Sequence, residues 1–136
     1  MSPVNRRFAL ALVVMLLVIP PSLTACSRGD SASTDGSALA WKVEPSPPAR
    51  GPATITIEPR YDDHTPITGA KLEIEGNMNH AGMAPVIATL TETTPGTYVS
   101  DGFEFTMGGD WVISVRGTLP DGTPYQAQID VGGVGG

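Results

Sequence analysis

The chain has 136 residues, and its 14 acidic side chains outnumber its 8 basic ones, which gives a formal net charge of −6. This acidic balance argues against nucleic acid or an anionic membrane surface as a partner, because both attract basic patches. The single cysteine excludes an internal disulfide, so the fold must be held together by its apolar core.

Residues 1–25 are typical of a bacterial lipoprotein signal peptide. Arg6 and Arg7 precede an uninterrupted apolar run from Phe8 to Ile19, which Pro20 ends. The run is shorter than the roughly 20 helical residues that are needed to cross a bilayer, and it fits a signal-peptide apolar region of roughly 7–15 residues. We therefore expect an exported protein.

The sequence LTAC at residues 23–26 resembles the lipobox, in which the cysteine is lipidated and the chain is cleaved before it. An ordinary signal peptide with an incidental cysteine is the alternative. Lipidation would anchor the mature chain through Cys26 to a membrane of the cell envelope, outside the cytoplasm, and stable anchoring takes more than one acyl chain. Cleavage would also remove Arg6 and Arg7, so the mature chain would be more acidic still.

Residues 26–52 are expected to form the lipidated cysteine and a flexible tether. Residues 27–38 are small and polar without periodicity, and cannot bury enough apolar area to offset the entropy of ordering. Prolines at 45, 47, 48 and 52 favour an extended chain. Residues 39–43 alternate in polarity, and are expected either to add an edge strand to the domain or merely to dock on it. The glycine-rich tail, 132–136, is expected to fray, which leaves 53–131 as the folded domain.

Period-two alternation of apolar and polar residues dominates the domain and predicts strands. In chain order the strands are expected at 54–58, 71–75, 86–91, 97–105, 111–116 and 125–131, with a bulge or bend near Asp101 and Gly102. Turn residues separate them at 62–66, 94–96 and 120–122. The sequence therefore predicts an all-β, immunoglobulin-like sandwich of about seven antiparallel strands. Its expected core comprises Leu72, Ile74, Tyr98, Phe103 or Phe105, Trp111 and Ile113.

A cluster of candidate metal donors follows the second of these strands. Met78 and His80 are two residues apart, so both side chains point to one side of an extended segment, and Gly82 allows a turn that brings Met83 round. Met107 precedes the strand at 111–116, in a turn that we expect at the same end of the sandwich. Thioethers and an imidazole form a soft ligand set that selects Cu(I) over hard ions.

Two other interpretations of these residues stay open. The methionines can fill irregular gaps in the core, and this packing role is the one expected for Met107 taken alone. The segment can also be a hydrophobic contact with another protein. His64 lies in a separate turn beside two aspartates, where a solvated loop histidine is expected.

The stretch from about Gly69 to Val131 resembles the YtkA-like domain family, and is also similar to FixH-type periplasmic domains. The resemblance rests on three patterns: Met78-x-His80-x-x-Met83-x-Pro85, Pro95-Gly96-x-Tyr98, and Phe105-x-Met107-x-Gly109-x-Trp111-x-Ile113-x-Val115. It implies a small exported β-sandwich that handles copper. Asn77 and Asn79 flank Met78 here, whereas members of the family often have a proline beside the first methionine and further Met or His residues in the loop.

Two functions follow as hypotheses. The domain binds copper and delivers or buffers it near a membrane, or it is an adaptor without metal that contacts a membrane protein. We expect no enzymatic activity, because the sequence holds no Ser/His/Asp arrangement, phosphate-binding glycine loop or reactive thiol. Glu73 and Glu75 share one strand face, where solubilising residues are expected.

Overall fold

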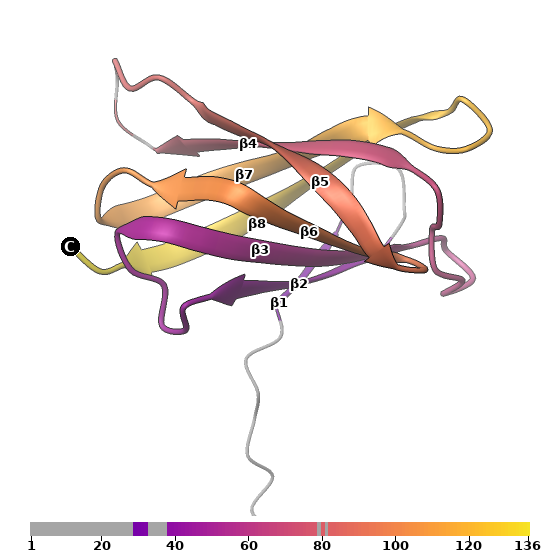
Figure 1. Ribbon diagram of the computed structural model, residues 1–136, viewed down its shortest axis with the longest axis horizontal. Helices are drawn as coiled ribbons and strands as arrows, with labels where there is room; N and C mark the ends of the chain where they lie inside the picture. The colour runs from indigo at the N-terminus through magenta and orange to yellow at the C-terminus, as the bar shows by residue number, and fades with distance from the viewer. Residues whose placement is uncertain (1–28, 33–37, 79, 81) are drawn as a thin grey trace, which may run out of the picture.

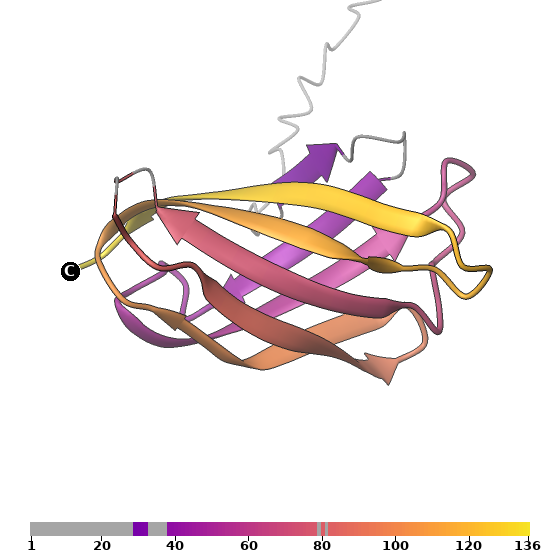
Figure 2. The same ribbon diagram turned by 90° about the horizontal axis from the view of Figure 1, so that it is seen from above.

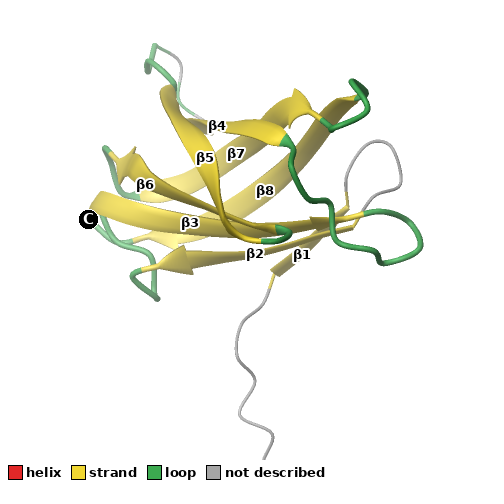
Figure 3. Cartoon of the chain, turned by 45° about the vertical axis from the view of Figure 1, so that its right-hand side comes forward, coloured by secondary structure: helices red, strands yellow, loops and turns green. Residues whose placement is uncertain are grey.

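The computed structural model describes residues 29–32, 38–78, 80 and 82–136, so the predicted signal peptide and Cys26 lie outside the described residues. This part of the chain contains only strands, turns and loops (Figure 3), and no helix in it is long and apolar enough to cross a membrane. The strands are β1 (Gly29–Ala32), β2 (Ala38–Glu44), β3 (Gly51–Arg60), β4 (Lys71–Met78), β5 (Val86–Thr94), β6 (Thr97–Phe105), β7 (Gly109–Thr118) and β8 (Pro124–Val134).

All neighbouring strands pair antiparallel, in the order β1-β2-β3-β6-β5-β4-β7-β8. The sheet folds over on itself, so that β2, β3 and β6 face β4, β7 and β8 (Figures 1 and 2). Strand β5 joins the two layers, because residues 86–90 pair with β4 and residues 91–94 pair with β6. The predicted immunoglobulin-like, all-β sandwich is confirmed, with eight strands among the described residues instead of about seven.

The core lies between the two layers, and it forms because apolar and polar residues alternate along each strand. Along β8, for example, Tyr125, Ala127 and Ile129 are buried while the residues between them are exposed. Three aromatic rings pack edge to face at the centre, with ring centroids 5.2–6.2 Å apart. Every predicted core residue is buried, and both phenylalanines are included: Leu72, Ile74, Tyr98, Phe103, Phe105, Trp111 and Ile113.

The bulge expected in the strand at 97–105 is confirmed. β6 is continuous, but its register against β3 shifts between Ala53, which pairs with Phe103, and Ile55, which pairs with Ser100. Two residues of β6 therefore lie opposite one residue of β3. The extra residue lets both Ser100 and Phe103 face the core.

The folded unit extends beyond the expected boundaries at both ends. Residues 39–43, placed within the tether but expected either to add an edge strand or to dock, belong to β2, so the strand alternative is correct. β2 pairs along most of β3, because Leu39 and Val43 are buried against the core. The tail is also paired. Val134 is buried and lies opposite Gly109, and the backbone of Gly135 forms hydrogen bonds of 2.8 and 2.9 Å with Arg50 and Pro48.

Tyr98 fixes the connection between β3 and β4. Its buried hydroxyl accepts a hydrogen bond from the Ala70 N–H and donates one to the Ile67 carbonyl, each at 3.0 Å. We expect Tyr98→Phe to lower the free energy of unfolding by about 2 kcal/mol at pH 7, because two backbone groups lose a partner. Urea denaturation would measure this loss, with the exposed Tyr61→Phe as control.

The same residue predicts a pH dependence. Burial raises the pKa of Tyr98, and the nearby Glu92 carboxylate raises it further, although the hydrogen bond from Ala70 opposes the shift. A raised pKa stabilises the folded state below the unfolded value of about 10, and that contribution is lost as the pH rises through the folded pKa. Stability should therefore fall above about pH 10, and less steeply in Tyr98→Phe. An equal decline in both proteins would contradict this assignment.

Candidate metal site

The four candidate donors lie in or beside two connections at one end of the sandwich. Because the strands are antiparallel, the β4–β5 connection and the β6–β7 connection leave the sheet at the same end, which also holds the C-terminus (Figures 1 and 2). Met78 is the last residue of β4, His80 and Met83 lie in the β4–β5 connection, and Met107 lies in the β6–β7 connection. The expectation that the Met107 turn lies at the end of the Met78 segment is confirmed.

Met78 is the donor that the fold holds most firmly. It pairs with Trp111 across β4 and β7, is half-buried, and packs against the core. Its Cε lies 3.1 Å from the place that a Cβ on Gly109 would occupy, so the absence of a side chain at Gly109 makes room for the thioether. Met78 therefore contacts the start of β7, directly after the connection that carries Met107.

Met107 is fixed through its backbone and exposed through its side chain. Its carbonyl accepts a hydrogen bond of 3.0 Å from the indole N–H of Trp111. Met107 is 44% exposed and Met83 is 36% exposed, which is unusual for large apolar residues. His80 is exposed as well. Two thioethers and an imidazole are therefore accessible from solvent at this end of the molecule.

The structure separates these residues from the second histidine. His64 is exposed in the connection between β3 and β4, at the opposite end of the sandwich, where its carbonyl accepts a hydrogen bond from Arg60. The described residues hold no group of three or more His, Cys, Asp or Glu side chains that could bind a metal ion. Met78, His80, Met83 and Met107 are thus the described residues whose chemistry and position suit a soft ion.

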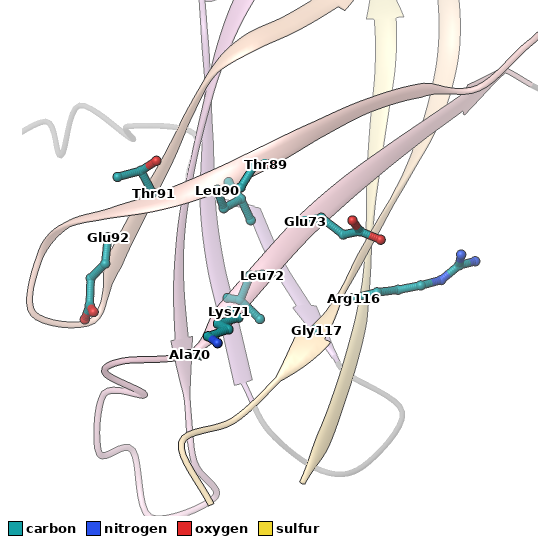
Figure 4. A pocket seen from close by; sticks show the side chains of 10 residues that line it. All are labelled: Ala70, Lys71, Leu72, Glu73, Thr89, Leu90, Thr91, Glu92, Arg116 and Gly117. Carbon is teal, nitrogen blue, oxygen red and sulfur yellow. The ribbon is translucent and has the colours of Figure 1, made fainter. Parts of the chain in front are cut away.

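A hollow of about 580 Å³ lies toward the other end of the sandwich, where β4 and β5 diverge (Figure 4). Figure 4 shows Glu92 pointing toward the β5–β6 turn and Arg116 extending away from the hollow. Both are engaged: Glu92 accepts hydrogen bonds from two backbone N–H groups, and Arg116 forms an ion pair of 2.9 Å with Glu75. No methionine or histidine lines this hollow, so it supplies no soft donor.

A groove of about 590 Å³ adjoins Met78, and sequence reasoning missed it. It runs over β4, β7 and β8, and its lining residues include Val112, Asp110 and Asp130. The two aspartates are far apart in the sequence, and only the pairing of β7 with β8 brings them to one surface. No local pattern in the sequence signals such a neighbourhood.

The fold and the candidate donors define a class of protein: a small β-sandwich domain that carries methionine and histidine residues at one end. The family model described as YtkA-like matches residues 39–116, which is more than half of the chain and runs from β2 to β7. The chain therefore belongs to the YtkA-like family. No curated protein and no solved structure matches it.

Proposed function

We propose that this chain is a membrane-anchored, extracytoplasmic domain that binds Cu(I) through Met78, His80 and Met83, with Met107 as a further donor. In this proposal Cys26 carries the lipid anchor, and the domain delivers or buffers copper outside the cytoplasm without catalysing a reaction. The observation that carries the proposal is the position of three thioethers and one imidazole at one end of the sandwich, with the side chains of Met83 and Met107 exposed.

The chemistry of the donors fits Cu(I). Thioethers are soft ligands that select Cu(I), whereas hard ions prefer carboxylate and carbonyl oxygens. A thioether has no proton to lose, and an imidazole needs only to be neutral, so this ligand set works where free thiols would be oxidised. Zinc sites are usually built from cysteine, histidine and carboxylates, and the described residues contain no such group.

A Cu(I) competition titration tests the proposal. The full-length chain should carry Cys26→Ser, because a free thiol would itself bind Cu(I). We expect one Cu(I) per chain, taken from a chromogenic chelator under ascorbate. The double variant Met78→Leu/His80→Ala should bind at least about 100-fold more weakly, since even changes outside the first ligand shell cost 10–100-fold.

The substitutions are chosen so that lost binding does not reflect lost folding. Leucine preserves the volume of the half-buried Met78, and His80 is exposed. His64→Ala is the matched control, because it removes an exposed imidazole at the other end of the sandwich. Met107→Leu measured alone decides whether Met107 is a ligand. Equal affinity in the double variant and the parent would contradict the proposal.

The alternative function is an adaptor without metal, in which this end of the sandwich contacts a membrane protein. Met83, Ile87 and Met107 are exposed large apolar residues, and such residues suit a protein contact. The titration separates the two functions, because an adaptor would leave Cu(I) with the chelator in the parent and the variant alike. The double variant would then reduce the recovery of a membrane partner while the metal content stayed unchanged.

A further inference from the structure

The methionines at the metal end differ in how far their side chains are open to solvent. Met107 and Met83 are exposed, whereas Met78 is half-buried and packs against the core. The two exposed methionines lie in the β6–β7 and β4–β5 connections, at one end of the sandwich and outside its core (Figure 2). A reagent in solution therefore reaches these two side chains more readily than it reaches Met78.

An exposed thioether is also a readily oxidised group. The only cysteine of the chain is Cys26, so within the described residues the oxidisable sulfur atoms belong to methionines. Oxidation converts methionine into its sulfoxide, which is polar and which reductases convert back to the thioether. A sulfoxide is no longer the soft thioether that selects Cu(I). The exposure that suits Met83 and Met107 to bind a metal ion therefore also opens them to oxidation.

The fold accommodates a sulfoxide at Met83 and Met107 more easily than at Met78. Neither exposed methionine belongs to the buried core. The turn of Met107 is held through its backbone, by the hydrogen bond of 3.0 Å from the Trp111 indole N–H to the Met107 carbonyl, and this bond does not involve the sulfur. At Met78, in contrast, Cε lies 3.1 Å from the place that a Cβ on Gly109 would occupy, so a new oxygen would enter packed surroundings.

We propose that Met83 and Met107 are oxidation sites, at which hydrogen peroxide forms sulfoxides that weaken copper binding while the fold is kept. In each step a lone pair of the sulfur attacks one peroxide oxygen, so that an S–O bond forms and the O–O bond breaks. The hydroxide that leaves takes the proton of the transferred oxygen and becomes water. Sulfur thus loses two electrons, and the peroxide gains them. The oxidation needs no metal, but the release of copper rests on the proposed function.

Peptide-resolved mass spectrometry of the full-length chain tests where oxidation occurs. The chain should carry Cys26→Ser, because peroxide would also oxidise the thiol. In hydrogen peroxide without metal, we expect sulfoxide to form at Met107 and Met83 at least about threefold faster than at Met78. The urea midpoint of the chain oxidised at both exposed sites should stay at the value of the untreated chain. Oxidation of Met78 at the same rate, or loss of the cooperative urea transition, would overturn the proposal.

Copper affinity and its repair test the consequence. After removal of the peroxide, the chain oxidised at Met83 and Met107 should bind Cu(I) at least about tenfold more weakly than the untreated chain. Methionine sulfoxide reductases acting on both sulfoxide epimers should restore the affinity. The matched control is Met83→Leu/Met107→Leu, which keeps the side-chain volumes and should lose no further affinity in peroxide.

The outcomes separate the two proposals. Unchanged affinity after oxidation, or a loss that the reductases do not reverse, would overturn the effect on copper binding. A parent chain that binds no Cu(I) would overturn the release of copper together with the proposed function. Unselective oxidation would overturn the assignment of Met83 and Met107 even in a parent chain that binds Cu(I).

Discussion

Replacing Trp111 with alanine is expected to lower the free energy of unfolding by about 4 kcal/mol, which is within the usual range for deleting a buried tryptophan. Trp111 is 2% exposed, and its ring packs edge to face on Phe103 and Phe105, with centroids 6.2 and 5.4 Å away. Alanine would leave a cavity between the two layers of the sandwich. It would also remove the N–H that holds the Met107 carbonyl.

A graded series separates these contributions. Trp111→Phe keeps an aromatic ring but loses the N–H and part of the volume, so we expect a loss of about 2 kcal/mol. Urea denaturation measures both variants, and Trp41→Phe is the control, because Trp41 is half-buried on strand β2 near the edge of the sheet. A loss below about 1 kcal/mol for Trp111→Ala would mean that the aromatic cluster does not form the centre of the core.

Gly117→Ala should destabilise the domain by more than about 3 kcal/mol, although it adds only one methyl group. A Cβ at this position would overlap the Lys71 carbonyl oxygen, and would lie 2.8 and 2.9 Å from the Cδ2 and Cα atoms of Leu72. Two of these three atoms belong to the backbone of β4, so no change of side-chain rotamer relieves the overlap. Strand β4 would have to move away from β7, and the hydrogen bonds between the two strands would be strained.

The control for this prediction is Gly102→Ala. Gly102 is exposed on β6, in the other layer of the sandwich, and no atom lies within 4 Å of the place that a Cβ there would occupy. We expect a change within about 0.5 kcal/mol for this variant. Thermal and urea denaturation of the two variants would measure the difference. Similar stabilities would show that β4 and β7 approach each other less closely at Gly117.

The strands of the sandwich were predictable because the alternation of apolar and polar residues along each strand is visible in its own sequence. Leu72 and Ile74 on β4, or Ile129 on β8, show their inward direction through their immediate neighbours. The pairing of the tail was not predictable, because Gly135 is held by backbone hydrogen bonds to Pro48 and Arg50, and these leave no pattern of side chains. The change of partner along β5, from β4 to β6, was not predictable either, because it depends on the register of three strands.

The candidate site was predictable to the extent that it is local. Met78, His80 and Met83 are neighbours in the sequence, and the order of the expected strands indicated that Met107 would lie at the same end. The sequence could not indicate that Gly109 makes room for Met78, nor that Asp110 and Asp130 flank one groove. Both depend on how β7 aligns with β4 and β8, and that alignment is set by pairing over many residues.

The position of the C-terminus has a practical consequence for measuring copper. A Cβ on Gly108 would lie 3.0 Å from the Val134 carbonyl oxygen and 3.1 Å from the backbone of Gly136, so the last residue sits against the turn that carries Met107. A polyhistidine purification tag fused after Gly136 would begin at the candidate site and bring extra imidazoles to it. Such a tag would bind copper whether or not the domain does. Affinity purification should therefore use a tag without histidine, cysteine or methionine.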